Sequence, residues 1–505
     1  MTSASEVPPE LSPVFAYIDT NADQLVARLA EAVAIKSVSA QADTRPDTIR
    51  VMQWFADKLR ARGLSVELVD IGTECRPDGQ TLPLPPVLLA SLAATDPSAK
   101  TLLVYGHLDV QPADRADGWR TDPFVLTEVD GRLYGRGATD DKGPVMGWLN
   151  AIDAYQRTDT AIPVNLKFVV EGMEETGSDG FDELIVSLKD TFLADVDYVC
   201  ISDNYWLGTT KPCLTYGLRG IACFGVEVEC AHKDLHSGAY GGSVHEAMTD
   251  LTALLYRLVD SKGNILIPGV MDDVAVQTAE ELAAYETIDF DSDEYRREIG
   301  TSRLLYEKKA DILAHRDEYR REIGTSRLLY EKKADILAHR WRYPSLFIHG
   351  VEGAHSGPGV KTVIPGKVSG KFSIRLVPNQ CPDKIAAQVV AYLTAEFAKL
   401  DSPNRLSVVN RPPSKPWVAD TRNQNFTAAK LAVRSVFGAD PDLTREGGSI
   451  PVALTFEEVT GKSVLLLPIG GCDDCAHSQN EKIDRKNYIS GTKVLAAYIH
   501  HLANV

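Results

Sequence analysis

The feature that most constrains the fold is an alternation of short apolar runs with helical segments in the first 211 residues. The runs at 101–106, 164–172 and 197–203 have the length and composition of buried strands, whereas 47–63 and 143–157 repeat apolar residues with helical spacing. Strands separated by helices form a mostly parallel sheet that is covered on both faces. We therefore expect an α/β fold whose ligands collect where the parallel strands end.

A second pattern begins near residue 212. Its strands and helices follow in the order βαββαβ, which is typical of a small two-layer domain. Further along the chain, 425–438 and 491–502 have helical spacing and flank the strand-like run 463–470. We predict that a first domain of residues 1–211 and 415–505 is interrupted by an inserted domain of residues 212–414.

The inserted domain contains a perfect repeat. Residues 293–316 recur without a change at 317–340. Two copies do not make a solenoid, which needs three or more repeats. We predict that one copy belongs to the fold and that the other is a tolerated insertion.

Composition excludes several classes of partner. The formal net charge of −17 disfavours nucleic acid and anionic membranes. No apolar run approaches the ~20 residues of a membrane-spanning helix, and no secretory signal is evident. The eight cysteines are thinly spread along 505 residues, which is typical of a reducing compartment rather than of a disulfide scaffold. We expect a cytoplasmic protein.

Histidines and carboxylates gather at the predicted strand ends. His107, the pair Glu174–Glu175 and Asp203 each follow an expected strand, and Asp140 and His477 lie in polar loops. Imidazole and carboxylate ligands suit zinc or manganese. Two ions that share a carboxylate are a recurrent hydrolytic arrangement, which needs no serine or cysteine nucleophile. An exposed loop is the alternative interpretation for any one of these residues alone.

Three sequence motifs contain several of these residues and connect the chain with a known family. GHLDVQP (106–112), GRGATDDKGP (135–144) and EGMEETGS (171–178) occur in this order. With them the chain resembles the M20 metallopeptidase family, and within it the branch of non-specific dipeptidases that act on Cys-Gly and carnosine. The resemblance covers nearly the whole chain apart from one copy of the repeat. It implies a zinc-peptidase catalytic domain and an inserted domain that serves as lid and dimerisation domain.

The resemblance implies two divalent metal ions per subunit, zinc or manganese. His107 would bind one ion and His477 the other, while Asp140 would bridge them and be followed by a cis peptide bond. Glu175 and Asp203 would complete the two sets of ligands, one for each ion.

The resemblance also assigns the catalytic roles. Asp109 would hydrogen-bond the second ring nitrogen of His107, and Glu174 would be the general base. His236 would act across a homodimer interface and stabilise the developing oxyanion. The alternatives are a solvated acidic turn for the glutamate pair and a histidine that only caps its own glycine-rich loop.

Three further residues are candidates for substrate binding, together with His236. They are Thr362, Arg375 and Ser449. A guanidinium such as that of Arg375 forks onto a carboxylate, which suits the C-terminus of a small peptide. An arginine that extends from a strand into solvent is the alternative interpretation.

The sequence thus predicts a metal-dependent dipeptidase. An N-acyl amino acid hydrolase or a carboxypeptidase of the same fold is the second hypothesis. A binding protein that has lost the chemistry is the third, and the intact Glu174 and the full ligand set speak against it.

Overall fold

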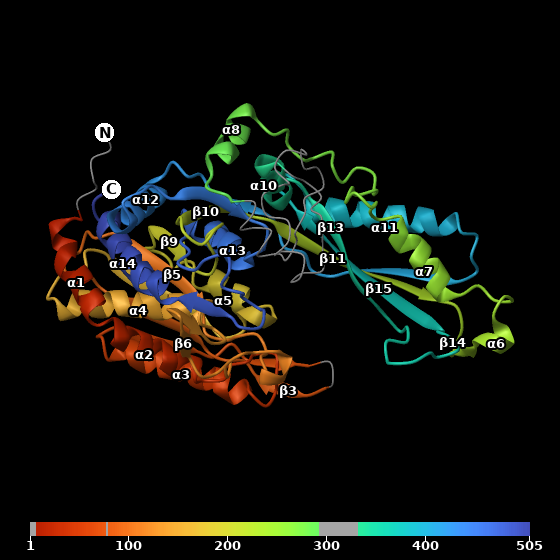
Figure 1. The fold of residues 1–505 in the computed structure, drawn as a ribbon, viewed down its shortest axis with the longest axis horizontal. Coiled ribbons are helices and arrows are strands. Elements are labelled where there is room, and N and C mark those ends of the chain that lie inside the picture. The colour runs from red at the N-terminus through yellow and green to blue at the C-terminus, as the bar shows by residue number, and fades with distance from the viewer. Residues whose placement is uncertain (1–6, 77–78, 292–331) are drawn as a thin grey trace.

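The chain folds into a large α/β lobe and a narrower second lobe, with both termini on the large lobe (Figure 1). The computed structural model describes residues 7–76, 79–291 and 332–505. Within these residues, no helix is both long and apolar enough to cross a membrane.

A nine-stranded sheet forms the centre of the large lobe. Its middle strands β8, β5, β9 and β19 run parallel, and antiparallel strands flank them on both sides, which confirms the expected α/β sheet. In spatial order the strands are β1 (Ser65–Val69), β4 (Val87–Leu92), β8 (Asn165–Glu171), β5 (Thr101–His107), β9 (Tyr198–Ile201), β19 (Val464–Leu466), β10 (Cys213–Leu218) and β17 (Trp417–Val418), with β18 (Asp442–Glu446) also paired to β10.

Helices cover both faces of this sheet. Along β5, Tyr105 makes edge-to-face contacts with Phe181 of α5 and Phe456 of α13, at 5.7 Å between ring centroids in each case. The next residue, Gly106, faces helix α4 on the opposite side, as the alternation of a strand requires. The helices of this lobe are α1 (Ser12–Thr20), α2 (Ala22–Val33), α3 (Arg45–Arg60), α4 (Lys142–Arg157), α5 (Phe181–Ser187), α12 (Gln424–Phe437), α13 (Pro451–Thr460) and α14 (Arg485–Leu502).

The second lobe has the predicted βαββαβ order. Its antiparallel sheet has the spatial order β13, β15, β11, β16, and helices α7 and α11 pack against it. Burial alternates along β11, and Phe224 stacks on Phe372 at 5.0 Å in the core between sheet and helices. The elements are β11 (Gly220–Glu229), α7 (Ala247–Tyr256), β13 (Ser345–Glu352), β15 (Lys367–Leu376), α11 (Pro382–Ala398) and β16 (Arg405–Asn410).

The predicted limits of the inserted domain are wrong at its start. Strand β10 pairs with β19 and β17, so residues 213–218 belong to the large sheet, and the chain enters the second sheet only after Arg219. Only Arg219 separates β10 from β11, so the strand-like run of the sequence continues across the break except for Gly-Leu-Arg-Gly at 217–220. Helices α8 (Ala279–Thr287) and α10 (Lys333–Trp341) also share a hydrophobic cluster with Trp206 of the large lobe.

Most of the repeat lies outside the described residues. The whole first copy and residues 317–331 of the second are not described, whereas residues 333–340 form nearly all of α10. Leu337 and Trp341 of this helix are buried in the cluster with Trp206. The end of the second copy is therefore part of the packed structure.

Short strands complete the fold. They are β2 (Thr73–Cys75) with β3 (Thr81–Pro83), β6 (Thr127–Val129) with β7 (Arg132–Tyr134) and β20 (Lys482–Asp484), and β12 (Leu235–His236) with β14 (Val363–Ile364). The pair β12–β14 and the short helix α6 (Ser237–Tyr240) lie at the far tip of the second lobe (Figure 1).

Candidate metal centre

The candidate site lies where parallel strands of the large sheet end. β5 ends at His107, the 3-10 turn Glu174–Thr176 follows β8, and Asp203 follows β9. Asp140 precedes helix α4, and His477 lies between β19 and β20. Because β5 runs parallel to both β8 and β9, these side chains meet at one edge.

Glycine at position 106 lets helix α4 begin against the end of β5. A Cβ atom at Gly106 would lie 2.5 Å from Cγ2 of Val145 and 2.7 Å from Oδ2 of Asp141. Only a residue without a side chain allows this approach. The close contact brings Asp140, at the start of α4, next to His107, and the Asp140–Asp141 peptide bond is cis as expected.

Two groups of three side chains each could hold a metal ion, and both contain Asp140. One group is His107, Asp140 and Asp203; the other is Asp140, Glu175 and His477. Within each group, the ligand atoms all lie within 4.8 Å of one another. Oδ1 of Asp140 is 3.2 Å from Nε2 of His107, and its Oδ2 is 3.1 Å from Nε2 of His477. The carboxylate is thus placed to bridge two ions.

The charges of the site favour a cation at both positions. Burial lowers the pKa of His107, but three nearby carboxylates together raise it well above its ordinary value: Asp109, Asp140 and Asp203. Hydrogen bonding to Asp140 is the largest of the effects that raise the pKa of His477 to about 11. Each ring therefore faces an excess of negative charge.

The donor atoms fit zinc or manganese. Nε2 of His107 is buried, and it has no hydrogen-bond partner among the residues that the structure describes. Nδ1 of the same ring lies 3.1 Å from the carbonyl oxygen of Asp109 and 3.4 Å from its Oδ1. Both oxygens are acceptors, so they favour a proton on Nδ1 and leave the Nε2 lone pair for a metal.

Asp109 joins His107 to the glutamate pair. Its side chain is fully buried, and the carboxylate accepts hydrogen bonds from the backbone N–H groups of Glu174 (3.2 Å) and Glu175 (3.1 Å). Asp109 therefore contacts the ring mainly through its backbone carbonyl and holds the turn that follows β8 through its carboxylate.

The two adjacent glutamates have different surroundings. Gln111 donates its backbone N–H and its side-chain amide to the carboxylate of Glu175, which also lies 3.0 Å from Nε2 of His477. The carboxylate of Glu174 approaches Nε2 of His107 only to 3.9 Å. Burial is the largest of the effects that raise the pKa of Glu174 well above its usual value, and nearby carboxylates such as Asp203 add to it.

The four candidate substrate residues form two separate pairs. Arg375 donates from Nη1 to Oγ of Ser449 at 3.0 Å, and this hydroxyl donates to the carbonyl of Arg219, where the chain passes between the two sheets. His236 and Thr362 lie instead at the tip of the second lobe, where the backbone N–H of the residue after His236 donates to the carbonyl of Thr362 at 3.2 Å. Within one chain, the structure does not bring the second pair to the metal ligands (Figure 1).

Two residues near the ligands have no role in the sequence-based assignment. Glu481 and Arg136 form a buried ion pair beside Asp140. Arg136 falls within the motif GRGATDDKGP, whereas Glu481 lies outside the three motifs and 345 positions further along the chain. No local pattern pairs them, and only the fold brings them together.

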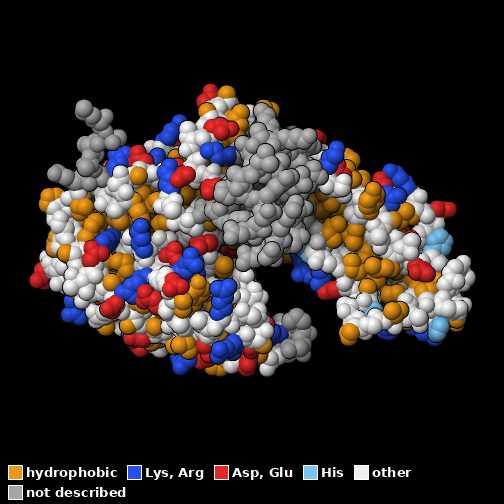
Figure 2. Space-filling view, in the orientation of Figure 1, with side chains coloured by type: hydrophobic (Ala, Val, Ile, Leu, Met, Phe, Trp, Pro, Cys, Tyr) orange, Lys and Arg blue, Asp and Glu red, His pale blue; other side chains and the backbone are white. Residues whose placement is uncertain are grey.

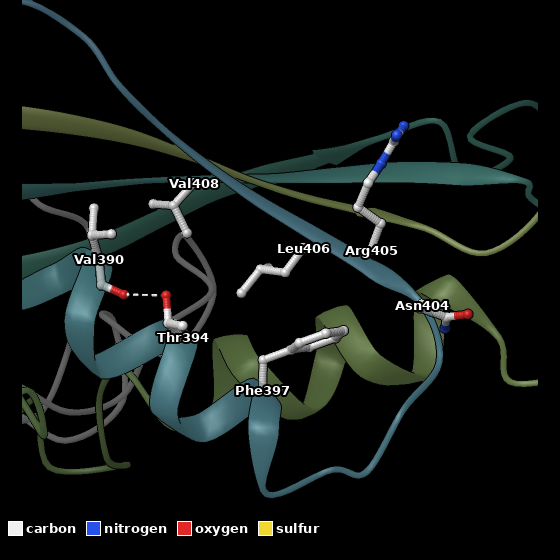
Figure 3. A pocket seen from close by; sticks show the side chains of 7 residues that line it. All are labelled: Val390, Thr394, Phe397, Asn404, Arg405, Leu406 and Val408. Atoms are coloured by element: carbon white, nitrogen blue, oxygen red, sulfur yellow. Dashed lines mark hydrogen bonds between the residues drawn. The ribbon is translucent and has the colours of Figure 1, made fainter.

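A hollow in the second lobe is lined by apolar and polar side chains of α11, of β16 and of the residue that precedes β16 (Figure 3). Its lining residues are Val390, Thr394, Phe397, Asn404, Arg405, Leu406 and Val408. None of these seven is a carboxylate, a histidine or a cysteine, so the hollow lacks the groups that hydrolysis needs.

Comparison with known proteins decides the family. Residues 103–501 match the family described as Peptidase family M20/M25/M40. The chain belongs to this family. It is therefore a peptide hydrolase of the M20 metallopeptidases, which implies the use of divalent metal.

Similar proteins extend over the full length of the chain. Beta-Ala-His dipeptidase of Homo sapiens is 49% identical, over 100% of this chain and 95% of that protein. Cys-Gly metallodipeptidase dug1 of Schizosaccharomyces pombe is 46% identical, over 98% of this chain and 99% of that protein. The crystal structure of human carnosine dipeptidase 1 has a TM-score of 0.87 at 48% identity, with 99% of this chain and 100% of that chain covered. An M20 family metallo-carboxypeptidase from Sulfolobus solfataricus has a TM-score of 0.76 at 25% identity, with 96% and 100% covered.

Proposed function

We propose that this chain hydrolyses dipeptides, Cys-Gly or a broader set, with two zinc or manganese ions per subunit. The observation that carries the proposal is the shared carboxylate, because the two oxygens of Asp140 face two different histidines. Relatives at 46–49% identity over their whole length are named dipeptidases, which supports the substrate class.

In the proposed mechanism, His107, Asp140 and Asp203 would hold one ion. Asp140, Glu175 and His477 would hold the second. Two such ions would supply Lewis-acid activation of the substrate carbonyl and of a water molecule.

The proton is moved by Glu174 in this proposal. Its carboxylate lies at the edge of the ligand cluster, and burial raises its pKa above the usual value, which makes it a stronger base. It takes the proton from the attacking water and delivers it to the leaving amine. Asp109 keeps the His107 ring in the tautomer that binds metal.

The four candidate substrate residues would bind the C-terminal carboxylate of the substrate and the developing oxyanion. Arg375 and Ser449, which contact each other, would bind the C-terminal carboxylate. His236 and Thr362 lie at or beside the β12–β14 pair, at the far tip of the second lobe and away from the large lobe that carries the proposed metal ligands (Figure 1). We therefore propose a homodimer in which His236 of the partner subunit stabilises the developing oxyanion.

Exposed apolar surface on the second lobe is consistent with such a dimer. Hydrophobic side chains gather on the face of this lobe seen in Figure 2. Phe347 and Ile348 on the outer strand β13 are 46% and 43% exposed, and Val409 on the opposite outer strand β16 is 43% exposed. We further propose that the dimer is cytoplasmic.

Metal analysis combined with a panel of peptides tests this function. We expect two ions per chain and rapid hydrolysis of dipeptides with free N-termini. Preferential cleavage of N-acyl amino acids would favour the acylase alternative. Release of single residues from longer peptides would favour a carboxypeptidase, the activity named for the Sulfolobus structure. No turnover with a fully loaded protein would favour a binding protein.

A further inference from the structure

Glu481 and Arg136 form an ion pair in the interior of the large lobe, beside the candidate metal ligands. Nη1 of Arg136 lies 2.7 Å from Oε2 of Glu481, and the two side chains are 4% and 0% exposed. Removal of one partner of a buried pair leaves the other charge uncompensated. Because the pair is buried, it is not simply two solvated charges at the protein surface, and its position beside the ligands requires another explanation.

The carboxylate of Glu481 accepts four hydrogen bonds, two on each oxygen. Oε2 accepts from Nη1 of Arg136 and from the backbone N–H of Gly137 at 3.1 Å. Oε1 accepts from the backbone N–H groups of Thr139 at 3.0 Å and Asp140 at 3.2 Å. The loop that carries Asp140 is thus wrapped around one carboxylate.

Gly137 makes this wrapping possible. Its φ angle is +86°, and a Cβ atom there would lie 2.9 Å from Cγ1 of Val110 and from Cδ of Lys142. The loop therefore has a single tight path, in which successive N–H groups point at Glu481.

Arg136 connects the same point to two other loops of the site. Its Nη2 donates to the carbonyl of Ser478 at 3.1 Å, next to His477, and to the carbonyl of Pro112 at 3.4 Å, in the loop that follows His107. The guanidinium also lies over the ring of Trp119, 5.2 Å from its centroid. The pair thus touches the loops that carry His107, Asp140 and His477.

We propose that Glu481 and Arg136 are positioning residues, which hold Asp140 between His107 and His477 so that the two ions bind as one unit. The inference rests on the proposed two-metal site. Neither residue contacts an ion in this proposal. They act through the loop of Asp140, so their loss weakens both sites together.

Substitution of Glu481 by glutamine tests the inference with little change in volume. The side-chain NH₂ of the glutamine would replace one carboxylate oxygen and face the two donors that now bind that oxygen. Two of the four hydrogen bonds of Glu481 would therefore be lost, while the packing is kept. We expect the affinity of the metal-free protein for Mn²⁺ to fall about 10–100-fold at both positions, as for other residues that orient metal ligands. The spin-coupled electron paramagnetic resonance signal of a bridged Mn²⁺ pair should also be lost.

Asp153→Asn is the matched control. Asp153 is another buried carboxylate, paired with Arg28 and Arg62 at 3.1 Å each, but it lies near the far end of α4. We expect it to lower the thermal stability of the metal-free protein while both Mn²⁺ ions bind as in the wild type. Stability loss alone therefore does not explain the effect expected for Glu481→Gln.

Arg136→Lys is a second variant in case Glu481→Gln does not fold. Lysine keeps the positive charge but cannot donate to Glu481, Ser478 and Pro112 together. We expect weaker binding of both ions here as well. Wild-type Mn²⁺ affinity and an unchanged coupled signal in either folded variant would overturn the inference. A wild-type chain that does not bind two Mn²⁺ ions would instead overturn the two-metal site, and this inference with it.

Discussion

Adjacent residues with the same side chain have different surroundings at this site. Glu175 is held by Gln111 and lies 3.0 Å from His477, whereas Glu174 lies at the edge of the ligand cluster. The turn that carries both is fixed by Asp109, so a one-residue shift would exchange the two carboxylates. Substitution at each position should therefore produce a distinct defect.

Glu174→Gln should keep both metals and lose turnover. The amide has nearly the volume of the carboxylate, but it cannot accept the proton, so we expect kcat to fall about 10²–10⁴-fold. His477→Ala should instead lower the metal content, because a proposed ligand is removed. Metal analysis and kcat measured on the same samples separate the two defects, and full activity in Glu174→Gln would contradict the assigned mechanism.

At the scale of elements, the fit between β5 and α4 determines where His107 and Asp140 meet. The end of the strand and the start of the helix approach so closely that there is no room for a Cβ atom at position 106. This close approach depends on both elements. Without it, His107 and Asp140 would not lie next to each other.

Gly106→Ala should therefore damage both the fold and the metal centre. The added methyl group would meet Val145 and Asp141, and overpacking of this kind costs about 1–3 kcal/mol. We expect a lower free energy of unfolding in denaturant and weaker metal binding. Gly225→Ala on β11 is the matched control, because its Cβ would meet nothing closer than 3.7 Å. Equal effects of the two variants would contradict this account.

Local patterns in the sequence predicted the elements better than the connections between them. The positions of the main strands and helices and the βαββαβ order follow from local patterns, and the structure confirms them, although β9 and β19 are shorter than the runs 197–203 and 463–470 that predicted them. The sequence does not predict the break at Arg219, because β10 and β11 are separated by this one residue and the short Gly-Leu-Arg-Gly segment does not show that the two strands belong to different sheets. The pairing of Arg136 with Glu481 was missed because it joins segments 345 positions apart.

The end of the second repeat copy forms nearly all of helix α10. Deletion of residues 317–340 leaves a chain in which an identical segment precedes Trp341, so helix α10 and its buried Leu337 position are kept. We expect soluble expression, thermal stability and activity close to those of the full chain. Loss of soluble protein would show that both copies are structural.

At the scale of the whole molecule, the residues proposed to act in one reaction lie in two different lobes. The proposed metal ligands lie in the large lobe, and His236 lies in the β12–β14 pair at the far tip of the other (Figure 1). His236 is exposed, and its Nδ1 accepts a hydrogen bond from the N–H of Gly238 at 3.0 Å. This contact fits a histidine that only caps its own loop, but it also leaves Nε2 available to a neighbouring subunit.

Mixed dimers decide between these two roles. His236→Ala alone should lower kcat about 10²–10³-fold if the ring stabilises an oxyanion, and Glu174→Gln alone should lower it about 10²–10⁴-fold. If His236 acts in trans, the site on the His236→Ala chain of a mixed dimer has its own Glu174 and an intact His236 of the partner subunit. Random exchange makes half of the dimers mixed, and each has one complete site, so about one quarter of wild-type activity should return. Exchanged dimers that stay inactive would place His236 in its own subunit or outside the reaction.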